Sequence, residues 1–145
     1  GMYANYNIYK TKDSRYVSVG CLEKKFWTNL CNALERTDLI DLIDCEENHP
    51  YLKEQLTLEF EKRTMAEWET YLKGKDTCVT PILNFAEACD AEQTKANEMV
   101  LTVNDEELGE YKQIGFAMKL SKTPAQLSKR APRLGEDNKE ILGED

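Results

Sequence analysis

A change in side-chain period near the N-terminus constrains the fold of this sequence more than any other feature. Residues 16–20 alternate in character and place two valines on one face, which is the pattern of a β-strand. From Lys24 onward the apolar residues recur at helical spacing, which is the pattern of a helix with one buried side. The sequence therefore predicts a strand that ends at Gly20 and leads at once into a helix, with the carboxylate Glu23 at the junction.

A second alternating run, residues 5–9, precedes a polar turn and predicts a β-hairpin with residues 16–20. We predict an α+β fold: a small, mainly antiparallel sheet of three to five strands with four or five packed helices and an extended C-terminal arm. Residues 1–118 are expected to form the small domain, and residues 119–145 an extended basic arm with a short terminal helix. The other expected elements are helices at 24–34, 37–45, 51–63, 64–74, 84–89 and 136–142, a helical turn at 93–99, and strands at 78–83, 99–103 and 111–114.

Two of these helices begin with a capping box. The Thr64 hydroxyl can accept a hydrogen bond from the Glu67 amide, while the Glu67 carboxylate accepts one from the Thr64 amide. Asn84 and Glu87 have the same spacing. Gly74 is expected at the end of the helix that Thr64 opens, because glycine readily adopts the left-handed conformation found there.

Composition excludes several kinds of partner and site. The net charge is −8, which argues against nucleic acid and anionic membranes because both need clustered Lys and Arg. No run approaches the ~20 apolar residues of a membrane span, and no signal peptide is visible, so we expect a cytoplasmic protein. The lone histidine, His49, is expected in an exposed loop, and no closely spaced ligand pair predicts a metal site. The five cysteines are interpreted as buried, reduced thiols: Cys21, Cys31, Cys45, Cys78 and Cys89.

Several blocks of sequence carry a family resemblance. Residues 8–34 read IYKTKDSRYVSVGCLEKKFWTNLCNAL, and this run resembles the start of the small domain of family III CoA-transferases, the CaiB/BaiF group. That group includes formyl-CoA transferase, carnitine–CoA transferases and α-methylacyl-CoA racemase. Further blocks match the family in the expected order: RTMAEW at 63–68, DTCVTPIL at 76–83, GFAMKLSKTP at 115–124 and APRLGE at 131–136.

The resemblance implies that this chain is the second domain of an acyl-CoA-processing enzyme. Transferases of the family take the acyl group from the thioester onto an aspartate as a mixed anhydride, and the racemases use a His–Asp pair for proton transfer. Those groups, and most contacts to CoA, belong to a large first domain, to which residues 119–145 would return. The resemblance therefore implies a chain that is catalytically incomplete alone, with CoA or acyl-CoA as substrate and no tightly bound cofactor.

The resemblance leaves one candidate catalytic residue here, Glu23, in a secondary role. It matches the glutamate of the family's Gly-Ala-Leu-Glu motif, which in racemase-like members is similar to an active-site carboxylate facing the catalytic pair across the domain cleft. The alternative is that Glu23 is an acid favoured by the dipole at the start of a helix. The neighbouring Cys21 has no histidine nearby and is interpreted as a buried thiol and not as a nucleophile.

Three functions stay open. The first is transfer of CoA between carboxylic acids through an enzyme-bound acyl intermediate, the second is racemisation of an α-methylacyl-CoA, and the third is a non-catalytic binding or assembly module. Residues 1–5 lack the glycine-rich loop of formyl-CoA transferase, which favours the racemase-like or broader acyl-CoA branch over oxalate and formate substrates. Full-length members resemble one another in forming interlocked homodimers, and the oligomeric state of an isolated second domain stays open.

Overall fold

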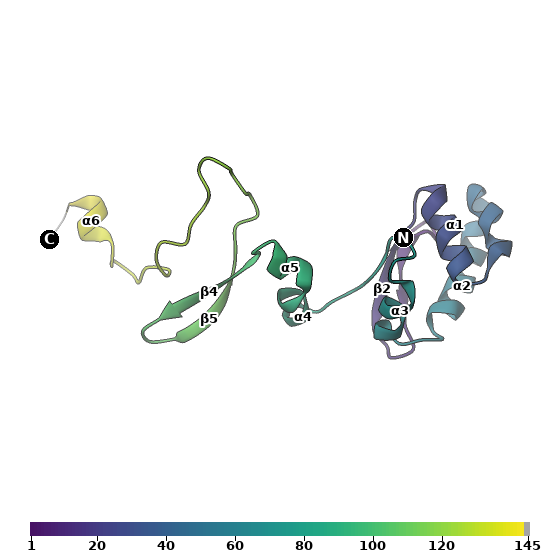
Figure 1. The fold of residues 1–145 in the computed structure, drawn as a ribbon, viewed down its shortest axis with the longest axis horizontal. Helices are drawn as coiled ribbons and strands as arrows, with labels where there is room; N and C mark the ends of the chain where they lie inside the picture. Colours follow the sequence, from purple (N-terminus) through teal and green to yellow (C-terminus); the bar gives the residue numbers. More distant parts are fainter. Residues whose placement is uncertain (144–145) are drawn as a thin grey trace. The chain divides into compact units, whose positions relative to one another are not determined.

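The computed structural model describes residues 1–143, which form two compact units, one of residues 1–82 and one that begins at Leu83 (Figure 1). The first unit contains a three-stranded antiparallel sheet in the order β1-β2-β3. Its strands are β1 (Tyr6–Lys10), β2 (Tyr16–Gly20) and β3 (Val79–Pro81). The predicted hairpin is thus confirmed, and β3 joins it on the β2 side.

Pairing register decides which face of the hairpin is buried. Tyr9 lies opposite Val17, and both side chains are buried in the core. Tyr6 and Ile8 belong to the other face and are 58% and 56% exposed. The turn between the strands contains Ser14 in the left-handed region, at φ 62°. An apolar, solvent-facing strip therefore runs along the outer side of β1.

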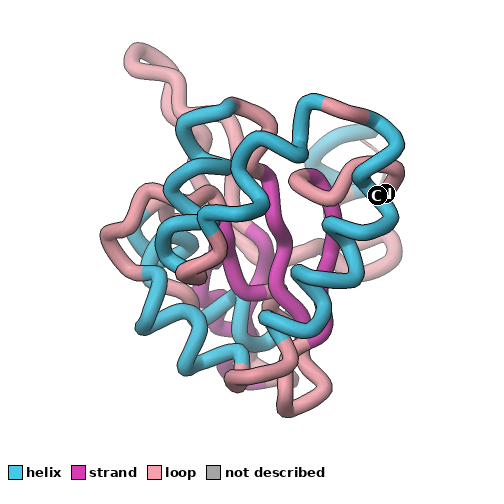
Figure 2. Tube along the Cα trace, turned by 90° about the vertical axis from the view of Figure 1, so that its right-hand side faces the viewer, coloured by secondary structure: helices cyan, strands magenta, loops and turns pink. Residues whose placement is uncertain are grey.

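The helices of the first unit bury the inner side of the sheet. Helix α2 contacts β1, and α3 contacts β3. Two indoles are fully buried, and each is oriented by a hydrogen bond from Nε1: Trp27 to the Ile40 carbonyl at 3.1 Å, and Trp68 to the Phe60 carbonyl at 2.8 Å. The helices are α1 (Lys24–Ala33), η1 (Thr37–Asp44), η2 (Glu46–Asn48), α2 (His49–Phe60) and α3 (Met65–Leu72), drawn in cyan in Figure 2.

The second unit has fewer buried side chains. It contains α4 (Phe85–Asp90), α5 (Glu92–Ala96), α6 (Asn138–Leu142) and a two-stranded antiparallel sheet of β4 (Val100–Asp105) and β5 (Gly109–Ile114). The segment 115–137 contains neither helix nor strand. Four of its basic side chains pair with acids of the same unit, namely Lys119, Lys129, Arg130 and Arg133. Arg130, for example, lies 3.1 Å from Asp105 and 2.8 Å from Glu136.

The predicted α+β class is confirmed, with differences in detail. The strands form two separate sheets, one of three strands and one of two. Residues 37–44, expected within a helix at 37–45, form a 3-10 helix whose N-cap residue, Arg36, makes no side-chain cap hydrogen bond. The expected division between residues 118 and 119 concerns the assembly of a larger protein and stays a prediction. No helix within residues 1–143 combines the length and apolar character that crossing a membrane requires.

Candidate functional site

The junction between β2 and α1 is held by backbone hydrogen bonds on both sides. The Gly20 amide donates to the Cys78 carbonyl at 3.0 Å, and the Cys21 amide donates to the Asn5 carbonyl at 2.8 Å. In return, the Asn5 side chain donates from Nδ2 to the Cys21 carbonyl at 3.0 Å. Since Asn5 and Cys21 are both buried, these bonds fix the backbone that leads to Glu23.

Glu23 is the N-cap residue of α1, with φ −79° and ψ 138°. Its backbone carbonyl accepts the first bond of the helix, from the Trp27 amide at 3.1 Å. Its side chain makes no cap hydrogen bond and is exposed. The carboxylate is therefore carried by an ordered backbone and is not used to satisfy the helix end.

The two lysines that follow Glu23 pair with other acids. Lys24 lies 3.2 Å from Asp44, and Lys25 lies 2.5 Å from Asp76. Hydrogen bonding to Asp76 raises the pKa of Lys25, with a smaller contribution from the charge of Glu23. The junction is thus a cluster of mixed charge, in which the lysine charges are already balanced by neighbouring carboxylates.

An apolar hollow of about 440 Å³ lies along the outer face of the hairpin. Tyr6 and Ile8 form one side of it, and it reaches Gly20, only three positions before Glu23 in the chain. We call it the hairpin hollow. Its lining consists of Gly1, Tyr6, Asn7, Ile8, Ser18, Val19, Gly20 and Cys78.

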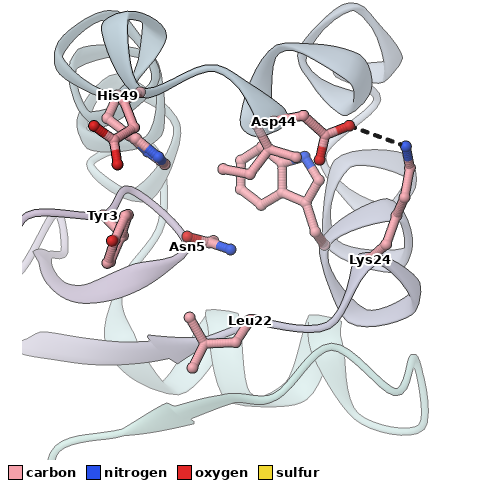
Figure 3. A pocket seen from close by; sticks show the side chains of 9 residues that line it. Tyr3, Asn5, Leu22, Lys24, Asp44 and His49 are labelled. Atoms are coloured by element: carbon pink, nitrogen blue, oxygen red, sulfur yellow. Dashed lines mark hydrogen bonds and ion pairs between the residues drawn. The ribbon is translucent and has the colours of Figure 1, made fainter.

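A second hollow, of about 320 Å³, lies beside the same junction and is drawn in Figure 3. Leu22 and Lys24, the two neighbours of Glu23, both line it, whereas Glu23 is not among its lining residues. We call it the His49 pocket. Its lining consists of Tyr3, Asn5, Leu22, Lys24, Trp27, Ile43, Asp44, Glu46 and His49.

The expectation that His49 lies in an exposed loop is wrong. It is the first residue of α2 and only 7% exposed. Its Nδ1 accepts a hydrogen bond from the Ala4 amide at 3.1 Å, and its ring meets Tyr3 edge to face at 5.1 Å between centroids. Sequence reasoning missed this residue because its acceptor role depends on a segment far away in the chain.

The cysteine prediction is confirmed for some thiols and wrong for others. Cys21 and Cys31 are buried, whereas Cys45 and Cys78 are exposed. Burial raises the pKa of the Cys21 thiol to about 12, and its Sγ donates to the Thr77 carbonyl at 2.7 Å. A protonated, hydrogen-bonded thiol is a poor nucleophile, which agrees with the interpretation of Cys21 as structural. Among residues 1–143, no group of three or more His, Cys, Asp or Glu side chains is arranged to hold a metal ion.

Comparison with known proteins identifies the family to which this chain belongs. A family model described as CoA-transferase family III matches residues 1–138. Alpha-methylacyl-CoA racemase of Mus musculus is 34% identical over 142 residues, which cover 96% of this chain and 36% of that protein. Succinyl-CoA:glutarate CoA-transferase of Mus musculus is 26% identical over 152 residues, which cover 99% of this chain and 34% of that protein. The chain thus spans about a third of the length of these curated relatives.

Solved structures share the fold. Rv3272 from Mycobacterium tuberculosis aligns with a TM-score of 0.76 at 20% identity, covering 94% of this chain and 40% of that one. A CaiB/BaiF family protein from Brucella suis aligns with a TM-score of 0.72 at 18% identity, covering 97% of this chain and 37% of that one. At these identities the likeness concerns the fold alone.

Proposed function

Because this chain belongs to CoA-transferase family III, we propose that it forms one wall of the active site of an acyl-CoA-processing enzyme, with Glu23 as its catalytic contribution. The observation that carries the proposal is the state of the Glu23 carboxylate. It is exposed at an ordered junction and is not used to cap the helix that follows it. A carboxylate held in this way can accept a hydrogen bond from a substrate or stabilise a positively charged partner.

The reaction we propose is transfer of CoA between carboxylic acids. A nucleophilic aspartate on a part of the enzyme outside these residues attacks the thioester carbonyl, the C–S bond breaks, and CoA leaves as the thiolate. The thiolate then attacks the aspartyl carbonyl of the resulting mixed anhydride and releases the donor acid. The acceptor carboxylate displaces the thiolate from the aspartyl thioester to form a second anhydride. The thiolate attacks the acyl carbon of the acceptor, which forms the new thioester and frees the aspartate. Glu23 acts across the cleft from that aspartate, so this chain alone is expected to be inactive.

The hairpin hollow is the proposed site for the acyl portion of the substrate. It is mainly apolar and reaches the end of β2 that leads to Glu23. Each methylene that an acyl chain buries there is worth about 0.8 kcal/mol. The phosphates of CoA are expected on another part of the enzyme, because the net charge of this chain is −8.

A second candidate is racemisation of an α-methylacyl-CoA. Two racemases, from mouse and human, are 34% and 31% identical to this chain over nearly its whole length. The two candidates differ in what the substrate loses. Racemisation in deuterated water exchanges the α-proton and leaves the thioester intact, whereas transfer breaks the thioester and leaves that proton in place. Mass spectrometry of one incubation with a branched acyl-CoA and a carboxylate acceptor separates them.

The test of Glu23 uses the full-length enzyme that carries this sequence. Glu23→Gln keeps the size of the side chain and removes its charge, and we expect turnover to fall by about 10²-fold while the melting temperature stays unchanged. Glu69→Gln is the matched control, because Glu69 is an exposed acid on α3, and it should leave turnover unchanged. Full turnover of Glu23→Gln would return this residue to the helix-dipole interpretation.

The chain by itself provides a separate test. Incubated with acyl-CoA and a carboxylate acceptor, it should neither transfer CoA nor exchange the α-proton. Measurable turnover by residues 1–145 alone would refute the placement of the nucleophile elsewhere. If neither the chain nor the full-length enzyme showed activity with any acyl-CoA, the third function, a binding or assembly module, would be supported instead.

A further inference from the structure

Two buried residues that line the His49 pocket each use one side-chain polar atom in a hydrogen bond and leave the other without a partner among residues 1–143. Two of its lining side chains, His49 and Asn5, are each only 7% exposed, so each is more than nine-tenths buried. The segment that holds Asn5 is joined to His49 directly, through the 3.1 Å bond from the Ala4 amide to Nδ1. In Figure 3, His49 extends from a helix and Asn5 from the strand segment below it, and Lys24 and Asp44 lie on the opposite side of the hollow.

The hydrogen bond to His49 fixes the tautomer of its ring. Because Nδ1 accepts the Ala4 amide, the proton of the neutral imidazole must be on Nε2. Nε2 makes no hydrogen bond to any residue between 1 and 143. In that range, every side-chain N or O atom that is fully buried in a non-exposed residue has a hydrogen-bond partner. Nε2 is therefore in contact with solvent, and His49 is one of the residues that line the pocket.

Asn5 supplies the complementary group. Its Nδ2 donates to the Cys21 carbonyl at 3.0 Å, which fixes the orientation of the side-chain amide. Its Oδ1 is left as an acceptor without a partner among residues 1–143. By the same reasoning as for His49, this oxygen is in contact with solvent, and Asn5 lines the same pocket. The pocket thus presents one N–H donor and one oxygen acceptor on a rigid backbone.

The charges around the pocket oppose an anionic ligand. Asp44 and Glu46 line it, and the single lining cation, Lys24, is already paired with Asp44 at 3.2 Å. A carboxylate or phosphate would therefore face a net negative rim. The remaining wall is apolar and includes Trp27, which is fully buried, together with Leu22.

We propose that the His49 pocket binds a neutral carboxamide group. The carbonyl oxygen of the ligand accepts from His49 Nε2–H, its N–H donates to Asn5 Oδ1, and its carbon substituents lie against Trp27 and Leu22. This chemistry can come from two sources, the amide-containing pantetheine arm of CoA or a free small amide. The inference stands independently of the catalytic role proposed for Glu23, which does not line this pocket.

The test is a titration of the chain, followed by ¹⁵N–¹H NMR, with three probes: N-methylacetamide, pantetheine and acetate. We expect both amide probes to shift the signals of Ala4, Asn5 and the Trp27 indole in a saturable way, and acetate to leave them in place. Tighter binding of pantetheine than of N-methylacetamide identifies the CoA arm as the source, and equal affinities identify a free amide. The absence of saturable shifts, or equal shifts with acetate, overturns the proposal.

Two variants test the assigned atoms. His49→Asn places an amide oxygen where Nδ1 accepts the Ala4 amide but removes the Nε2 donor, and it should weaken amide binding about tenfold. Leu22→Trp fills the pocket from its rim and should abolish binding, whereas Leu58→Trp, the same change at an exposed position of α2, should have no effect. Unchanged amide binding by a folded His49→Asn, or by Leu22→Trp, contradicts the assignment.

Discussion

Two asparagine hydrogen bonds in the first unit allow a sharp test of what holds the Glu23 junction. Asn5 and Asn29 each donate from Nδ2 to a backbone carbonyl at 3.0 Å, the first to Cys21 and the second to Asp76. The bond of Asn5 is buried and that of Asn29 is exposed. Donor type, acceptor type and length are therefore matched, and burial is the main difference between the bonds.

Asn5→Ala should be much more costly than Asn29→Ala. Removing Asn5 leaves the Cys21 carbonyl without its donor in a buried position, which costs about 2 kcal/mol. For a unit of this size that corresponds to a fall in melting temperature of roughly 10 °C. Removing Asn29 lets water replace the donor, and alanine favours the α1 helix by a few tenths of a kcal/mol, so the net change should be close to zero.

Tryptophan fluorescence during urea unfolding is a suitable assay. The chain has two tryptophans, Trp27 and Trp68, and both are fully buried in the first unit, so the signal reports the unfolding of that unit. Midpoints and slopes for the wild type, Asn5→Ala and Asn29→Ala give the differences in free energy directly. Equal losses of stability for the two variants would refute the claim that burial decides the value of these bonds.

Three further predictions concern stability. Burial raises the pKa of the Cys21 and Cys31 thiols from 9.0 to about 12, so above about pH 9 only the unfolded thiols ionise. The free energy of unfolding should then fall as pH rises, by up to ~1.4 kcal/mol per pH unit per thiol. Replacing both cysteines by alanine should make the free energy of unfolding less dependent on pH in this range. The same pH dependence for this double variant and the wild type, measured in reducing buffer, would contradict the prediction. The hydrogen bond from the Thr64 amide lowers the pKa of Glu67 in the folded chain. The stability that this ionised carboxylate contributes is therefore present above the unfolded pKa and is lost as pH falls through the folded pKa. Glu67→Gln should remove this part of the loss of stability at acid pH, and an unchanged dependence of stability on acid pH would argue against it. Ser14→Gly should stabilise the chain by about 1 kcal/mol, since φ is 62° at Ser14 and glycine avoids the left-handed penalty; a lower urea midpoint would show that the serine is not strained.

Features that depend on a few neighbouring residues were predictable. Both capping boxes, Thr64 with Glu67 and Asn84 with Glu87, form as expected, because each needs only residues three positions apart. Gly74 has φ 78°, as its position after α3 predicts. The strands of the hairpin were also predictable, since alternation over five residues is a local property.

Features that depend on distant residues were not predictable from one sequence. The burial of His49 depends on Ala4, which lies 45 positions earlier and supplies the amide that Nδ1 accepts. Cys78 is exposed just before β3, where its backbone has φ 46° and its carbonyl accepts the amide of Gly20, 58 positions earlier in the chain. A sequence pattern shows that two side chains share a face, but it does not show which face another element will cover.

The candidate site likewise has features that the sequence determined and features that only the tertiary structure decided. By itself, the sequence determined that a carboxylate stands between a strand and a helix, because the change of period and Gly20 are local signals. Only the tertiary structure decided that Glu23 leaves α1 uncapped and that hollows lie beside the junction. It also brought Asn5 and His49 to one pocket, since hydrogen bonds between segments far apart in the chain form only when the whole unit has folded.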